Sequence, residues 1–304
     1  MTDYFELADV TKRFGKATAL DGVSFRVSEP SIVGLVGKNG SGKSTLLRHV
    51  VGLYLPTAGR CTTLGCPSAT LGADELARIG MVHQHDTLLG WMRAEELLRY
   101  VASFYNVWDR ELEAHLVELL EIERKDSVVS MSPGTRQKLA LVIATCHHPE
   151  LLLLDEPLSD LDPIVRRDVV EALLDRFRRD EVAIVISSHM LHDLERIADR
   201  IVCLDKGRIV ADAPLDELKE RYADWTVTSR SGRLPSRFAE SYVVAQEGTD
   251  TRAHITVLDP GAHLVAFEAA YEADVVSAPL NLERIFRVLA GAESDVHTSV
   301  PSAH

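Results

Sequence analysis

The chain has 304 residues, of which 46% are hydrophobic and 26% are charged, so it can bury one large core or two modest ones. The formal net charge of -13 and the lack of a basic run argue against nucleic acid as the main partner. No secretory signal begins the sequence, and its apolar stretches are far shorter than the roughly 18 residues of a spanning helix. We therefore expect a globular protein of the cytoplasm, with peripheral membrane contacts at most.

Four cysteines are few for this length and are typical of reduced thiols in the cytoplasm. Cys61 and Cys66 could form a pair of metal ligands. No second Cys or His pair occurs at a matching spacing, so structural thiols are the better expectation.

The first two thirds of the chain alternate between apolar runs and helical patterns. Early segments at 5–10 and 23–27 alternate in polarity, which indicates an antiparallel β-element. Later runs are continuously apolar, and each ends in a polar or glycine-containing turn, which predicts an α/β fold with a largely parallel sheet. These later runs are 32–36, 79–82, 151–154 and 182–186.

Helical periodicity dominates between residues 92 and 127, and we expect a helical subdomain at about 88–148, inserted into the α/β core. After a hairpin-like segment at 201–210 and a helix at 215–222, the pattern changes. Short strands are predicted near 225–228, 242–244 and 254–258, followed by a helix at 282–289. The predicted organisation is a main domain at 1–223, a small α+β accessory domain at 224–291 and a disordered tail at 292–304.

A glycine-rich segment follows the apolar run 32–36 and precedes an apolar helix. It fits the phosphate-loop pattern G-x-x-x-x-G-K-[ST], in which backbone N–H groups and a helix N-terminus surround phosphate oxygens. Lys43 would reach the β- and γ-phosphates, and Ser44 would bind Mg²⁺. The pattern alone could also be a flexible glycine turn. The candidate nucleotide-binding residues are Gly37, Asn39, Gly40, Ser41, Gly42, Lys43, Ser44 and Thr45.

Two adjacent acids end the buried run 151–154. A parallel strand would place Asp155 and Glu156 beside the phosphate loop. Asp155 suits coordination of Mg²⁺, directly or through water, and Glu156 suits the base that polarises an attacking water. Taken in isolation, the pair could simply cap a strand.

The sequence resembles the ATPase subunits of ATP-binding cassette transporters over about residues 3–222. Six motifs, including the phosphate loop and the acid pair, occur in that family's order. The resemblance implies that Phe14 stacks on adenine, although an ordinary core phenylalanine is the alternative. It implies that Gln84 contacts Mg²⁺ and the attacking water, and that His189 holds the γ-phosphate and Glu156 in register. Asp162, in the segment 159–162, would contact the opposite nucleotide site of a dimer.

The segment 131–138 occupies the place of the family's L-S-G-G-Q signature but departs from it. Ser132 and Gly134 remain, and the resemblance implies that they face the γ-phosphate bound on the opposing subunit, at a helix N-terminus. Pro133 fits a first helical turn, and Thr135 replaces the glutamine. We expect this departure to affect the turnover rate and the symmetry of the dimer, not the fold.

The segment 279–286 resembles the closing helix of ATPase subunits from bacterial exporters of drugs, antibiotics, polysaccharides or lipids. This implies an ATP- and Mg²⁺-dependent motor at the inner face of the cell membrane, paired with a second ATP-binding subunit, identical or different. A separate multi-spanning permease would carry the cargo. Four hydrophobic residues are candidates for contact with this permease, and they could equally form part of the core of the helical subdomain. They are Leu88, Leu89, Trp91 and Met92.

Two alternatives remain. A soluble ATPase of the same superfamily, acting in translation or DNA maintenance, usually carries a second cassette or a long coiled coil, and neither is visible here. An ATP-gated regulatory subunit with weak hydrolysis would explain the altered signature, but Glu156 and His189 are both present. An ATP-hydrolysing motor subunit of a membrane exporter is therefore the predicted function.

Overall fold

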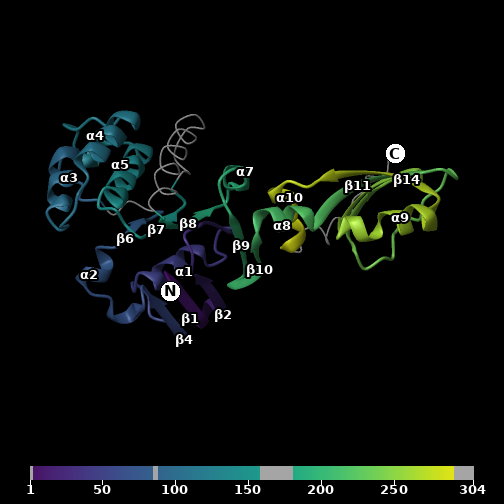
Figure 1. The fold of residues 1–304 in the computed structure, drawn as a ribbon, viewed down its shortest axis with the longest axis horizontal. Coiled ribbons are helices and arrows are strands. Elements are labelled where there is room, and N and C mark those ends of the chain that lie inside the picture. Colours follow the sequence, from purple (N-terminus) through teal and green to yellow (C-terminus); the bar gives the residue numbers. More distant parts are fainter. Residues whose placement is uncertain (1–2, 85–87, 158–180, 291–304) are drawn as a thin grey trace. The chain divides into compact units, whose positions relative to one another are not determined.

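A computed structural model describes residues 3–84, 88–157 and 181–290 (Figure 1). The chain forms two compact units, Met1–Asp212 and Ala213–His304. Asp162 and the predicted tail lie outside the described residues.

The centre of the first unit is a six-stranded sheet in the order β10-β9-β3-β8-β7-β6. Parallel ladders join β9 to β3, β3 to β8, β8 to β7 and β7 to β6. Every residue of β3 and β7 is buried, which explains why these strands are continuously apolar in the sequence. The strands are β3 (Ile32–Val36), β6 (Ile79–Val82), β7 (Leu151–Asp155), β8 (Ala183–Ser188), β9 (Arg200–Asp205) and β10 (Arg208–Pro214).

An antiparallel sheet in the order β2-β1-β4-β5 forms a second layer of this unit. Alternate residues of β2 are buried, as the alternating polarity predicts. Helix α1 (Lys43–Val50) lies between the two sheets and contributes Leu46, Leu47 and Val50 to a core shared with both. The other elements are β1 (Phe5–Phe14), β2 (Ala17–Val27), β4 (Ala58–Thr63), β5 (Cys66–Pro67) and α2 (Ala73–Leu76).

Three helices form the expected helical subdomain, at the end of the unit away from the antiparallel sheet (Figure 1). They are α3 (Ala94–Ala102), α4 (Arg110–Leu119) and α5 (Pro133–Thr145). Short helix α7 (Leu191–Leu194) follows β8 in the main body. The fold class predicted from the sequence, a cassette-type α/β core with antiparallel and helical subdomains, is confirmed.

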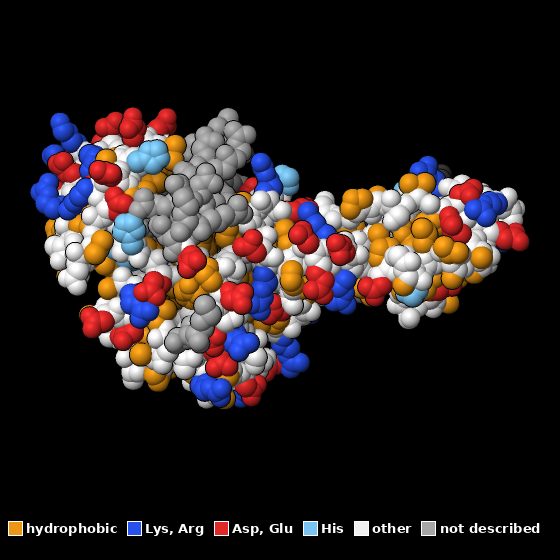
Figure 2. All heavy atoms as spheres, in the orientation of Figure 1, with side chains coloured by type: hydrophobic (Ala, Val, Ile, Leu, Met, Phe, Trp, Pro, Cys, Tyr) orange, Lys and Arg blue, Asp and Glu red, His pale blue; other side chains and the backbone are white. Residues whose placement is uncertain are grey.

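The second unit contains a four-stranded sheet in the order β12-β13-β11-β14. Trp225 on β11 is fully buried and packs edge-on against Phe267 of α9, with ring centroids 5.3 Å apart. Hydrophobic side chains also gather on the surface of this unit (Figure 2), where Val265 of α9 is 78% exposed. The elements are α8 (Leu215–Glu220), β11 (Tyr222–Ser229), β12 (Val243–Gly248), β13 (Arg252–Leu258), α9 (Pro260–Tyr271), β14 (Ala273–Pro279) and α10 (Leu282–Leu289).

The division between the units differs from the predicted boundary at residue 223. It falls between Asp212 and Ala213, because α8 contacts β11 and α10. Helix α8 ends at Glu220, and Tyr222 already begins β11. Helix α9 and strand β14 were not predicted from the sequence.

None of the helices in the described ranges is long and apolar enough to cross a membrane. Acidic and basic side chains are interspersed over the face of the first unit seen in Figure 2. None of the four cysteines, all of which lie in the described ranges, forms a disulfide, and Cys66 Sγ lies 3.7 Å from Glu75 Oε1. Among the described residues, no group of three or more His, Cys, Asp or Glu side chains could hold a metal ion.

Candidate nucleotide site

The candidate site lies where four neighbouring parallel strands end. The phosphate loop follows β3, His189 follows β8, Glu156 follows β7 and Gln84 follows β6. Because the carboxyl ends of parallel strands lie at one edge of a sheet, segments far apart in sequence converge there. The strand order β3-β8-β7-β6 therefore explains why these motifs meet.

The phosphate loop depends on glycine at two positions. Gly40 and Gly42 have φ angles of 79° and 112°, in a region that side-chain-bearing residues rarely adopt. A Cβ atom at Gly42 would also lie 2.6 Å from the carbonyl oxygen of Ala19. Gly42 precedes the first residue of α1, Lys43, so the loop leads into a helix N-terminus, which favours anions.

A pocket of about 180 Å³ lies over this loop. It contains most of the predicted nucleotide-binding residues and adds Gln84 and Glu156, which follow β6 and β7. Gly37 does not line the pocket, but its carbonyl oxygen accepts a hydrogen bond from Lys43 Nζ at 2.7 Å. The lining residues are Ala19, Asn39, Gly40, Ser41, Gly42, Lys43, Ser44, Thr45, Gln84 and Glu156.

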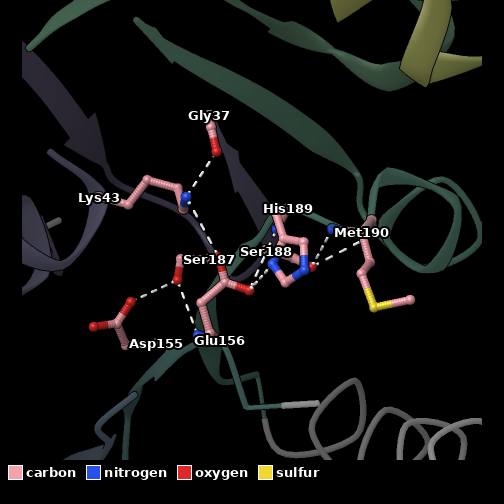
Figure 3. Close-up of polar contacts among 8 residues, drawn as sticks. All are labelled: Gly37, Lys43, Asp155, Glu156, Ser187, Ser188, His189 and Met190. Carbon is pink, nitrogen blue, oxygen red and sulfur yellow. Dashed lines mark hydrogen bonds and ion pairs between the residues drawn. The ribbon is translucent and has the colours of Figure 1, made fainter. Parts of the chain in front are cut away.

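Three predicted residues form a connected set at this edge (Figure 3). Lys43 Nζ lies 3.4 Å from Glu156 Oε1, and His189 Nδ1 lies 2.7 Å from Glu156 Oε2. The backbone N–H of His189 also donates to Glu156 Oε2, at 3.3 Å. Lys43 and Glu156 are only 6% and 4% exposed, and burying two charges is costly unless each is paired. The arrangement places an ammonium, a carboxylate and an imidazole together beside the pocket.

Asp155 is fully buried, and its two carboxylate oxygens differ. Oδ1 accepts a hydrogen bond from Ser187 Oγ at 2.7 Å, whereas Oδ2 has no partner among the described residues. Mg²⁺ in nucleotide sites is usually held by one or two carboxylates together with substrate phosphates and waters. Ser44 and Gln84 line the pocket whereas Asp155 does not, and the unpartnered buried oxygen of Asp155 is the kind of donor that such an ion takes.

The backbone of Glu156 adopts φ 51°, in the left-handed region. For a residue with a side chain, such a conformation costs about 1 kcal/mol or more. Its N–H donates to both the side-chain oxygen and the carbonyl oxygen of Ser187, at 3.0 Å and 3.2 Å. These bonds stabilise a conformation that the sequence did not predict. The sequence analysis also did not predict a role for Ser187.

Gln84 is exposed at the end of the segment that follows β6. The preceding carbonyl oxygen, that of His83, accepts a hydrogen bond from Gln137 Nε2 of α5 at 3.5 Å, which joins this segment to the helical subdomain. Burial lowers the pKa of His83, the positive charge of Arg48 lowers it further, and Asp155 opposes the shift. His83 is therefore neutral at physiological pH.

Phe14 lies outside the pocket lining, at the end of β1, and is 45% exposed. Its ring meets Tyr54 edge-on, with centroids 5.3 Å apart, and Lys12 Nζ lies 5.1 Å from the Phe14 centroid. An exposed ring held by neighbours is not a core phenylalanine. Stacking on adenine stays a prediction.

Ser132 and Gly134 also lie outside the pocket lining, at the N-terminus of α5. Ser132 Oγ accepts a hydrogen bond from the Thr135 N–H at 3.1 Å and lies 2.8 Å from the Thr135 hydroxyl. Pro133 occupies the first helical turn, where its lack of an N–H costs little. The altered signature therefore forms a well-capped helix start, and its contact with a second subunit stays a prediction.

Comparisons with known proteins identify the family of the chain. The family model described as ABC transporter matches residues 20–159. Nod factor export ATP-binding protein I from Rhizobium meliloti is 31% identical over 296 residues, covering 95% of this chain and 88% of its own. Bacitracin transport ATP-binding protein BcrA from Bacillus licheniformis is 30% identical over 223 residues, 73% of each chain.

Two solved structures share the cassette fold. An ATP-binding subunit of an ABC transporter superposes with a TM-score of 0.64 at 29% identity, over 71% of this chain and 92% of that one. A dimeric ATP-binding cassette in a post-hydrolysis state with ADP and Pi superposes with a TM-score of 0.62 at 25% identity, over 69% of this chain and 98% of that one. The family inferred from the motifs is confirmed: this chain belongs to the ABC transporter ATP-binding subunits, as an export-type ATPase.

Proposed function

We propose that the chain hydrolyses Mg²⁺-bound ATP with Glu156 as the base and works at the inner face of the cell membrane to drive export. The observation that carries this proposal is the contact of Glu156 with both Lys43 and His189 beside the phosphate-loop pocket. A base for hydrolysis must lie near the phosphates and be held in orientation by a second group. Glu156 lines the phosphate-loop pocket and contacts His189, which supports this role.

Each residue of the site has a separate role. Lys43 and the N–H groups of the phosphate loop neutralise and orient the phosphate oxygens. Glu156 accepts a proton from the attacking water, and His189 fixes the Glu156 carboxylate. Asp155, Ser44 and Gln84 would hold Mg²⁺, which would neutralise charge on the phosphates. The rate enhancement comes mainly from positioning and electrostatics.

The second subunit is proposed to be another copy of this chain. In that dimer, the N-terminus of α5 with Ser132 and Gly134 would face the γ-phosphate held by the partner copy, where the helix dipole favours negative charge. Asp162, outside the described residues, is proposed to contact the opposite site. Because each site would be completed by the other copy, neither copy would hydrolyse ATP efficiently alone.

The permease is proposed to contact the helical subdomain beside the segment of Gln84. Trp91 is 75% exposed there, and a large exposed aromatic is typical of an interaction site. Leu88, Leu89 and Met92 are half-buried and so would support the contact more than form it. The two named relatives export a Nod factor and transport bacitracin, and we propose a cargo from the drug, antibiotic, polysaccharide or lipid classes.

The test is affinity purification of Glu156→Gln from gently solubilised cells with ATP and Mg²⁺. Slow hydrolysis should preserve the closed dimer, and a multi-spanning membrane protein should remain bound. Lys43→Ala, purified in parallel, should bind ATP poorly and recover much less of that partner. Recovery of only soluble partners, ribosomes or DNA with Glu156→Gln would overturn the transporter role.

A further inference from the structure

Ser187, near the end of β8, lies between the two acids that end the adjacent strand (Figure 3). The register of β7 and β8 pairs it directly with Asp155. Its hydroxyl donates to Asp155 Oδ1 at 2.7 Å and accepts from the Glu156 N–H at 3.0 Å. The side chain is fully buried, so these two bonds use both its donor and an acceptor site away from solvent.

The first bond determines how Asp155 presents its carboxylate. One oxygen, Oδ1, is held by the Ser187 hydroxyl, and the other, Oδ2, is buried without a partner among the described residues. The terminal torsion of an aspartate is broad, so a donor on one oxygen is needed to fix the direction of the other. Outer-shell donors commonly orient metal-binding carboxylates in this way.

The second bond acts on the backbone of Glu156. That residue has φ 51°, and both acceptors of its N–H, the hydroxyl and the carbonyl oxygen, belong to Ser187. The direction in which the Glu156 side chain leaves the strand therefore depends on Ser187. The next serine, Ser188, instead accepts a hydrogen bond from the Met190 N–H at 2.9 Å, so the two serines have different roles.

We propose that Ser187 is a positioning residue for ATP hydrolysis. Its hydroxyl fixes the Asp155 carboxylate through Oδ1 and so leaves Oδ2 as the oxygen that would bind Mg²⁺, and it holds Glu156 in the backbone conformation that directs its carboxylate into the pocket. This inference rests on the proposed function of the site and assigns a role to a residue that does not line the pocket.

The test uses the full chain and the fluorescent analogue mant-ATP, titrated in EDTA and at increasing Mg²⁺. Ser187→Ala should bind mant-ATP in EDTA within about twofold of the parent, because the phosphate loop is intact. Its half-saturating Mg²⁺ concentration should rise about tenfold, as expected when an outer-shell partner of a metal ligand is lost. Ser187→Thr keeps the hydroxyl and should stay within about threefold of the parent.

Thr63→Val is the matched control. Thr63 is also fully buried, and its hydroxyl donates to the Val50 carbonyl oxygen at 2.6 Å, on β4 and away from the acids. Its loss should leave the Mg²⁺ dependence unchanged.

Three results would contradict the inference. They are a Ser187→Ala variant with the parent's Mg²⁺ dependence, equal losses of affinity with EDTA and with Mg²⁺, and a Ser187→Thr variant as impaired as Ser187→Ala. Each of these results would mean that Ser187 contributes only to packing. If instead the parent's own mant-ATP affinity does not respond to Mg²⁺, the proposed function itself fails, whatever the variants show.

Discussion

The two units of the molecule bury different kinds of side chain. Among the described residues, the first unit buries Lys43, Asp155 and Glu156 at one edge of its sheet. In the described part of the second unit, Thr256 is the only polar residue classed as buried. The centre of the second unit is aromatic, with Trp225 and Phe267 in contact. Because burying charge is costly, its concentration at one edge of the first unit supports the functional site proposed there.

The largest effect is expected from a variant that disrupts the contacts among Lys43, Glu156 and His189 in the first unit. Lys43→Ala removes the ammonium that neutralises the phosphates, and the ATPase rate should fall by a factor of at least about 100. Phosphate release in a coupled assay measures it. Lys125→Ala, at an exposed site on the helical subdomain, should keep the parent rate. A Lys43→Ala rate near that of the parent would remove the basis for calling this edge a site.

The next largest effect is expected from a variant that disrupts the aromatic core of the second unit. Trp225→Ala removes a fully buried side chain and should lower the free energy of unfolding by about 3–5 kcal/mol, with mant-ATP affinity retained. Denaturant unfolding followed by circular dichroism measures the loss. Val265→Ala, at a residue 78% exposed, should change stability by less than about 0.5 kcal/mol. Equal effects of the two variants would contradict the assigned core.

Glu113 is a buried charge of the first unit that lies away from the pocket. It accepts hydrogen bonds from Trp108 Nε1 at 2.8 Å, Arg110 Nη1 at 2.7 Å and Arg124 Nη1 at 2.9 Å. Glu113→Ala should therefore cost about 2 kcal/mol of stability, since three donors lose their acceptor. Chemical unfolding of the full chain tests this, with Glu118→Ala, exposed on the same helix, as the control. A negligible loss would show that the donors find water instead.

The same carboxylate predicts a pH dependence. Burial alone would raise the pKa of Glu113, but the hydrogen bonds from Arg124, Trp108 and Arg110 outweigh burial and lower the pKa below 4.5. Its stabilising contribution is therefore present above pH 4.5 and is lost as the pH falls through the lowered pKa.

The smallest expected effect concerns His147, which is 5% exposed and stacks on Tyr105 with centroids 4.2 Å apart. Burial lowers the pKa of His147 below 6.5, although hydrogen bonds to the carbonyl oxygens of Ile143 and Ile79 oppose the shift. The contribution of His147 to stability is thus complete above pH 6.5 and is lost progressively as the pH drops toward the lowered pKa.

Thermal unfolding at about pH 8 and about pH 5.5 measures this loss, because the two values bracket the titration of histidine. His147→Gln cannot titrate and should lose less stability on acidification than the parent. His115→Gln, at an exposed histidine, should behave like the parent. An identical acid loss in His147→Gln and the parent would assign the effect to other groups.

The first unit was far more predictable from sequence than the second, and for a physical reason. A phosphate loop requires Gly37, Gly42 and Lys43 at a fixed spacing, so residue type and spacing, together with the motifs that follow in order, indicate the loop. Strand β7 was predictable because a parallel strand buried on both faces is continuously apolar. Helix α9 was missed because its exposed positions include Ala262, Val265 and Ala266, so no polar face marks it as a surface helix.

Within the site, the acids were predictable but their supports were not. A serine at position 187 carries no signal of its own in the sequence, and its role depends on the register that pairs it with Asp155. The left-handed backbone of Glu156 likewise follows from tertiary hydrogen bonds and not from local propensity. The sequence offers only the position of Ser187, directly before the Ser-His at the end of a buried apolar run, and that position does not by itself indicate the contact.

The most direct test of Glu156 as the base compares ATP hydrolysis by the parent chain and Glu156→Gln in Mg²⁺, while the mass of each is followed in solution. We expect Glu156→Gln to lose at least about 100-fold in rate. We also expect Glu156→Gln to become a stable dimer with ATP. Equal rates in the two chains, or negligible rates in both even with the permease present, would contradict Glu156 as the base of an ATP-driven motor.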